Sequence, residues 1–111
     1  MHIDVKTVRE VTVVELGGEL VWTVVAEAEE RILAVAGPEC KFVLDLSHLS
    51  YLGSAGLRLL LSVFRTVSDQ GGRVLLVGLT PNIKDIMKAT GFLAFFPHCD
   101  DLETGLSVLS S

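Results

Sequence analysis

The stretch at residues 41–67, KFVLDLSHLSYLGSAGLRLLLSVFRTV, decides the fold. It opens with an apolar run at residues 42–46 that is typical of a buried strand. It then passes through a short polar segment and continues from Gly53-Ser54-Ala55-Gly56 with a helical pattern. We therefore expect a strand that leads into a helix over residues 54–68. Ser54 is placed to act as the N-cap of that helix, because serine is among the residues preferred there.

The start of this helix is a favourable place for a negative charge. The first N–H groups of a helix have no intrahelical partner, and the helix dipole adds partial positive charge at that end. A phosphate on Ser54 would bring about −1.5 to −2 charge and three acceptor oxygens to those groups. The residues alone leave two interpretations open, a serine that only caps the helix and a serine that is phosphorylated.

Strand and helix patterns alternate along the rest of the chain. Residues 5–8 and 11–16 predict a hairpin, whose second strand ends at Gly17-Gly18. The later elements are a helix at 24–36 capped by Thr23, a strand at 73–77, a helix opened by Thr80-Pro81 and ended by Gly91, an edge strand at 92–96, and a helix opened by a capping box of Asp100 and Glu103. The pattern predicts one α/β domain over residues 1–111, a central mixed sheet of about five strands with four helices packed on it.

The helix at residues 54–68 has an apolar arc wider than one sheet surface usually covers. The residues at core spacing are Leu57, Leu60, Leu61, Phe64 and Val67. Leu59 and Val63 lie on the flank of that face. We hypothesise that this flank, with Ser54, Ala55 and Arg58 at the helix start, docks a partner protein. The alternative is that a neighbouring helix covers the flank.

Composition excludes several classes of function. Nine Lys and Arg against fourteen Asp and Glu give a net charge of −5, which disfavours binding to nucleic acid. His2, His48 and His98 lack the spacing of metal ligands, and no phosphate-binding glycine loop occurs, so we expect neither metal nor cofactor.

The compartment follows from the cysteines and from hydropathy. Cys40 and Cys99 form no C-x-x-C pair, and we expect two reduced thiols, although the sequence leaves a disulfide between them open. The N-terminus has no apolar signal region, and no apolar run approaches the roughly 20 residues of a membrane span. A cytoplasmic protein with no membrane insertion is the expectation.

Several motifs together carry a resemblance to a known family. They are Asp45-Leu46-Ser47, Ser50-Tyr51-Leu52 with Gly53-Ser54-Ala55-Gly56-Leu57, Gly18-Glu19-Leu20, Gly71-Gly72-Arg73, Thr80-Pro81 and Thr90-Gly91-Phe92. In these motifs the chain resembles the STAS domains, the family of sulfate transporters and anti-sigma factor antagonists. The bacterial anti-sigma factor antagonists are the most similar group, and the resemblance covers nearly the whole chain.

The resemblance implies a function and a site. In those antagonists a partner kinase, which is also the anti-sigma factor, phosphorylates the serine that opens the helix. The matching position is Ser54, so the resemblance implies a phosphoacceptor there and no catalytic residue. The unmodified chain would bind the kinase and release a sigma factor, and phosphorylation would end that binding. The residues implied in partner binding are Glu19, Val21, Ser47, Gly53, Ser54, Ala55, Arg58 and Leu59.

Two departures from the family pattern support an alternative. Gly53 and Val21 stand where the family carries acidic residues. Some proteins of similar architecture are docking modules that are never phosphorylated, such as the cytoplasmic accessory subunit of a lipid-type ABC transporter, and the two departures favour this alternative.

An enzyme is a third reading. Strand, turn and helix around Ser54 also describe a nucleophile elbow, with His98 and Asp100 as partners. Leu52 stands where the elbow requires its first glycine, and 111 residues are too few for that hydrolase fold.

Overall fold

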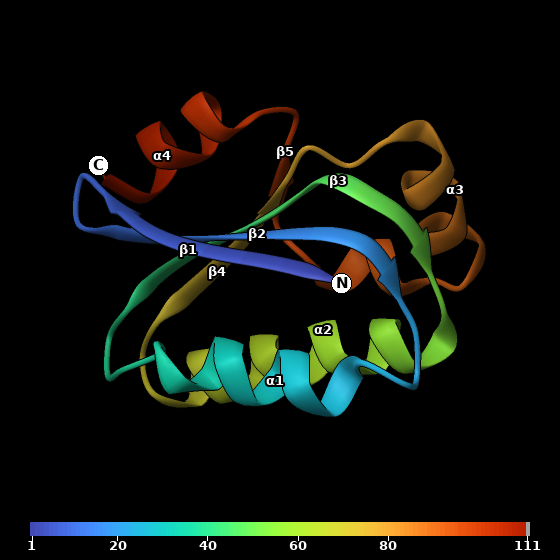
Figure 1. The fold of residues 1–111 in the computed structure, drawn as a ribbon. Coiled ribbons are helices and arrows are strands. Elements are labelled where there is room, and N and C mark those ends of the chain that lie inside the picture. The colour runs from blue at the N-terminus through green and yellow to red at the C-terminus, as the bar shows by residue number, and fades with distance from the viewer. Residues whose placement is uncertain (111) are drawn as a thin grey trace.

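The computed structural model describes residues 1–110 and has one five-stranded sheet with the order β1-β2-β3-β4-β5 (Figure 1). β1 (His2–Val8) runs antiparallel to β2 (Val11–Leu20). β3 (Lys41–Leu52), β4 (Arg73–Val77) and β5 (His98–Cys99) extend the sheet in parallel from β2. The sheet is therefore mixed, and with four α-helices it confirms the predicted fold class.

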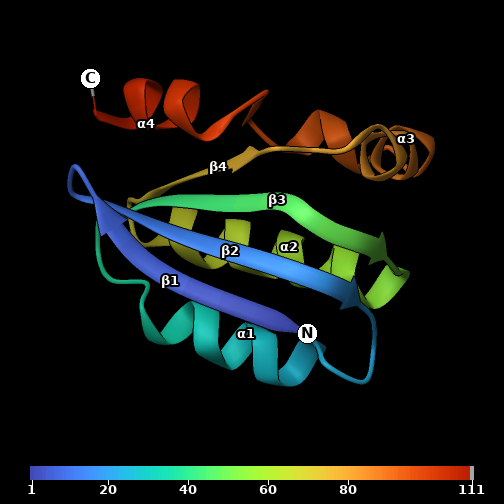
Figure 2. The same ribbon diagram turned by 45° about the horizontal axis from the view of Figure 1, so that its top comes forward.

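The helices form layers on both sides of the sheet. α1 (Val25–Ala34) and α2 (Ser54–Asp69) lie side by side on one face, and α4 (Leu102–Ser110) covers the other (Figures 1 and 2). α3 (Pro81–Ala89) packs against β3 and joins its buried Ile83 and Met87 to the core under α1 and α2. A smaller core lies under α4 around Leu106 and Leu109.

The apolar run of β3 reflects burial on both faces. Phe42, Leu44 and Leu46 belong to the core under α1 and α2, whereas Val43 belongs to the core under α4. All four side chains are fully buried. A parallel strand covered on both faces carries continuous apolar residues in place of alternation, which is why the stretch at 42–46 predicted this position.

The hairpin is confirmed, but its second strand is longer than predicted. Arg9 and Glu10 turn the chain with positive φ values of 52° and 66°, as a two-residue hairpin turn requires. Gly17-Gly18 does not end β2. The strand continues to Leu20, because both glycines remain paired with β3, Gly17 with His48 and Gly18 with Leu49. The register shifts once before and once after this pair, as at a β-bulge.

Three helix and strand boundaries differ from the predictions. Val24 is the N-cap of α1 and no side chain caps that helix, so Thr23 is not its cap. Residues 92–96 do not form an edge strand, since Phe92–Phe95 is a 3-10 helix, η1, and the edge strand is β5. At α4 the N–H of Thr104 donates to Asp101 Oδ1 at 2.8 Å, one residue along from the predicted pair of Asp100 and Glu103.

Two other local predictions are confirmed, the cap of α3 and the free thiols. Thr80 caps α3, because its Oγ1 accepts from the N–H of Ile83 at 3.3 Å and Pro81 follows at the first helical position. Cys40 and Cys99 are free thiols, and they pack against the cores on opposite faces of the sheet. None of the helices in residues 1–110 has the length and hydropathy that a membrane span requires.

Candidate functional site at the start of α2

Backbone geometry at the junction of β3 and α2 places Ser54 one residue further into the helix than predicted. Gly53 is the N-cap, with an extended backbone (φ −87°, ψ 176°). Its N–H donates to the Leu20 carbonyl at 3.0 Å, and its carbonyl accepts from the N–H of Leu57 at 3.0 Å. Since Gly53 already accepts the first helical bond, Ser54 is the first residue of α2 and not its cap.

The consequence is a helix start that no side chain satisfies. Gly53 has no side chain to cap the first-turn N–H groups, and the first turn carries no acidic residue. Those N–H groups and the helix dipole therefore favour an anion at this position. Ser54 is exposed at this end of the helix.

A hollow of about 210 Å³ lies directly beside Ser54. Its lining residues are Val21, Trp22, Tyr51, Gly53, Ser54 and Ala55. Trp22 is 78% exposed and Tyr51 is 47% exposed, so two large aromatic side chains stand in solvent around the serine. Solvent-exposed aromatic side chains of this kind are typical of protein interfaces.

Trp22 and Tyr51 were not among the predicted site residues. The signal in the sequence was weak but present: Trp22 is the single tryptophan of the chain, and it lies in a segment with no predicted strand or buried helix face. Strand pairing brings the two together, since Glu19 pairs with Tyr51 and Leu20 with Leu52 at the ends of β2 and β3.

The predicted partner-binding residues do not all lie at this hollow. Val21, Gly53, Ser54 and Ala55 line the hollow, and the exposed Glu19 is paired with Tyr51 at its edge. Ser47 lies elsewhere on β3. Its N–H donates to Asp45 Oδ1 at 3.0 Å, and it packs beside Gly78 at the end of β4.

A second depression, of about 350 Å³, runs between α1 and α2. Arg58, Ala55 and Leu59 line its α2 side. Across it, Ser62 Oγ donates to Glu29 Oε1 of α1 at 2.8 Å. Leu59 is only 3% exposed and Val63 is fully buried, so Leu59 is not the exposed docking residue that was hypothesised. The neighbouring helix α1 covers this flank, which was the alternative.

The enzyme reading gains no support from the geometry. His98 Nδ1 donates to the Phe96 carbonyl at 3.0 Å, and His98 lines a different hollow from Ser54. Within residues 1–110 the Ser54 side chain forms no hydrogen bond to a histidine that would activate it.

Comparison with known proteins agrees with this architecture. The family model that describes the STAS domain matches residues 2–105. The chain is 33% identical over 73 residues to BtrV of Bordetella bronchiseptica, which is named as an anti-sigma factor antagonist. That alignment covers 66% of this chain and 63% of BtrV, so the chain spans less than two thirds of this curated relative.

Solved structures match over almost the full length. A crystal structure of an anti-sigma factor antagonist from Mycobacterium paratuberculosis is 26% identical and superposes with a TM-score of 0.88, covering 99% of this chain and 94% of that one. The phosphorylated form of the Bacillus protein SpoIIAA is 21% identical with a TM-score of 0.71 over 96% of this chain and 99% of that one, which shows a shared fold. Because the family model covers nearly all of its residues, the chain belongs to the STAS domain family.

Proposed function

We propose that this chain is an anti-sigma factor antagonist that binds an anti-sigma factor through the surface around Ser54 and is released by phosphorylation of Ser54. The observation that carries the proposal is the position of Ser54, exposed as the first residue of α2 and beside a hollow with two exposed aromatic side chains. The names of BtrV and of the mycobacterial structure support the same function.

The unmodified surface is suited to a protein partner. Val21, Trp22 and Tyr51 offer apolar surface, and Ser54 and the first-turn N–H groups offer donors beside it. A suitable partner would place an apolar side chain in the hollow and a carbonyl or carboxylate oxygen at the helix start. It would then cover the apolar surface and accept hydrogen bonds from the donors. Buried aromatic anchors dominate the free energy of such interfaces.

Phosphorylation would end this binding without unfolding the domain. The helix start is electrostatically suited to a phosphate, so the free domain tolerates the modification. Inside the complex the same phosphate fills the space of the partner and carries about −1.5 to −2 charge into an apolar contact. A coupling free energy of about 3 kcal/mol would change the partner's dissociation constant by roughly two orders of magnitude.

In this account the partner is a serine kinase as well as an anti-sigma factor, and both proteins meet in the bacterial cytoplasm. The test is to recover the chain from its host with its bound partners, and to determine its intact mass and map peptides across residues 47–58. Ser54→Ala is the control. A phosphate on Ser54 that changes with growth conditions, and an anti-sigma factor that is recovered only with the unmodified chain, support the proposal.

The absence of acidic residues beside Ser54 favours a second candidate. Gly53 and Val21 carry no carboxylate, and the first turn of α2 has none either. A kinase that requires those carboxylates would not modify Ser54, and the chain would then be a constitutive docking subunit, for example of a lipid-type ABC transporter. Recovery with a transport ATPase, and no phosphate on Ser54 even when the kinase is co-expressed, would favour this candidate over the switch.

A further inference from the structure

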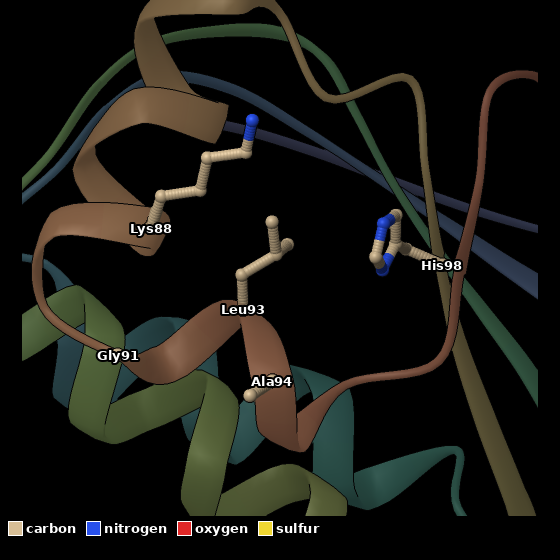
Figure 3. A pocket seen from close by; sticks show the side chains of 5 residues that line it. All are labelled: Lys88, Gly91, Leu93, Ala94 and His98. Atoms are coloured by element: carbon tan, nitrogen blue, oxygen red, sulfur yellow. The ribbon is translucent and has the colours of Figure 1, made fainter.

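A hollow of about 380 Å³ lies between the end of α3, η1 and β5, and it shares no lining residue with the hollow beside Ser54. Its lining residues are Lys88, Gly91, Leu93, Ala94 and His98. Figure 3 shows the side chains of Lys88, Leu93 and His98 pointing into one space from three separate segments. This volume is within the usual range for small-molecule sites.

The cationic group in the hollow is available for a ligand. Within residues 1–110 the close contacts between basic and acidic side chains are Arg9 with Glu103 and His48 with Glu15, so Lys88 contacts no carboxylate there. The chain as a whole carries a net charge of −5, which repels anions in general. An anion would therefore be held by this local ammonium group and not by the overall field.

His98 offers an acceptor in the same space. Its Nδ1–H donates to the Phe96 carbonyl at 3.0 Å, since a carbonyl oxygen can only accept. In a neutral imidazole the other ring nitrogen, Nε2, is then an acceptor. A hydroxyl group of a ligand would donate to Nε2.

The floor between these two polar groups is apolar. Leu93 and Ala94 come from η1, and the turn at Gly91, where φ is 80°, brings this segment back under the end of α3. We propose that this hollow binds a small hydroxy carboxylate with an apolar chain. Its carboxylate would pair with Lys88, its hydroxyl would donate to His98, and its chain would lie on Leu93 and Ala94.

The test uses 3-hydroxyoctanoate as the probe, added below its micelle concentration to the isotope-labelled chain at about pH 8. Saturable shifts of the backbone amide signals of Gly91, Leu93 and Ala94 are expected. Octanoate, which lacks the hydroxyl, should bind several-fold more weakly. The uncharged 3-hydroxyoctanamide should bind roughly two- to fivefold more weakly, because it cannot form a charged pair with the exposed Lys88.

Variants locate the site. Lys88→Met should weaken 3-hydroxyoctanoate binding roughly two- to fivefold, whereas Lys84→Met on the same helix should leave it unchanged. His98→Asn keeps a donor for the Phe96 carbonyl but removes Nε2, so it should lower the affinity for 3-hydroxyoctanoate to that for octanoate.

Four results would overturn the proposal. The shifts with 3-hydroxyoctanoate could fail to saturate, the amide could bind as tightly as the acid, Lys88→Met could bind the acid as tightly as the wild type, or inorganic phosphate alone could produce the same shifts. None of them bears on partner binding at Ser54.

Discussion

Gly56 in the first turn of α2 lies directly against Leu20 at the end of β2. A Cβ on Gly56 would stand 2.6 Å from the Leu20 carbonyl oxygen and 2.8 Å from Leu52 Cδ1. The start of α2 is therefore in backbone contact with the segment that leads into Val21 and Trp22. This contact positions Ser54 beside the exposed aromatic side chains.

Gly56→Ala should destabilise the domain because the added methyl group meets backbone that cannot move away. We expect a loss of about 1–3 kcal/mol in the free energy of unfolding, measured by urea denaturation. Gly37→Ala is the matched control, since nothing lies within 4 Å of a Cβ there. It should leave stability unchanged or raise it by about 0.4–1 kcal/mol. Equal stability of the two variants would contradict the close contact.

Ser54→Asp should stabilise the free domain, because a negative charge at the start of α2 interacts favourably with the helix dipole. A gain of about 0.3–1 kcal/mol is expected at low ionic strength, decreasing with added salt. Ser68→Asp near the other end of the same helix should have the opposite sign. Thermal unfolding of both variants checks the prediction, and a loss of stability in Ser54→Asp would argue against an anion-accepting helix start.

Trp22→Ala should weaken partner binding but not the fold. With 78% of its surface exposed, Trp22 contributes little to the core, so the midpoint of thermal unfolding should stay nearly constant. The affinity for the anti-sigma factor should fall by about 2 kcal/mol, or roughly thirtyfold, in a calorimetric titration. Phe95→Ala removes another aromatic side chain, 64% exposed, on η1, and should leave partner binding intact. Equal losses in both variants would place the interface elsewhere.

Asp101→Asn should remove a pH dependence at the start of α4. The N–H of Thr104 donates to the Asp101 carboxylate and holds its pKa below the ordinary value of 3.8. A carboxylate whose folded pKa is lowered stabilises the domain above the unfolded pKa, and this stabilisation is lost as the pH falls through the folded pKa. In acid titrations of unfolding, Asp101→Asn should lose less stability below pH 3.8 than the wild type does. An equal loss in the variant and the wild type would contradict the bond between Asp101 and Thr104.

The elements that could be predicted from the sequence are those whose burial imposes a pattern. Residues 42–44 and 74–77 are continuously apolar because both faces of β3 and β4 are covered. Thr80-Pro81 identified the start of α3, since a cap followed by proline acts locally. Ser54 was placed at the helix start to within one residue because glycine and serine are both good caps, and backbone geometry alone chooses between them.

The remaining features depend on contacts between distant segments. The run at 92–96 is short and apolar, and such a run fits a strand and a helical turn equally well. The burial of Leu59 depends on α1, a separate segment of the chain that packs against α2. Trp22 and Tyr51 come together only because β2 continues past Gly17-Gly18 to pair with the end of β3. No local sequence pattern predicts that pairing.

The most direct test of the central claim compares the affinity of the unmodified chain with that of the chain carrying phosphoserine at position 54. The partner is the anti-sigma factor recovered from the host, and calorimetry gives both dissociation constants while circular dichroism monitors the fold. The account predicts that the phosphorylated chain remains folded and binds roughly a hundredfold more weakly, which corresponds to about 3 kcal/mol. Equal affinities of the two folded forms would contradict a switch at Ser54.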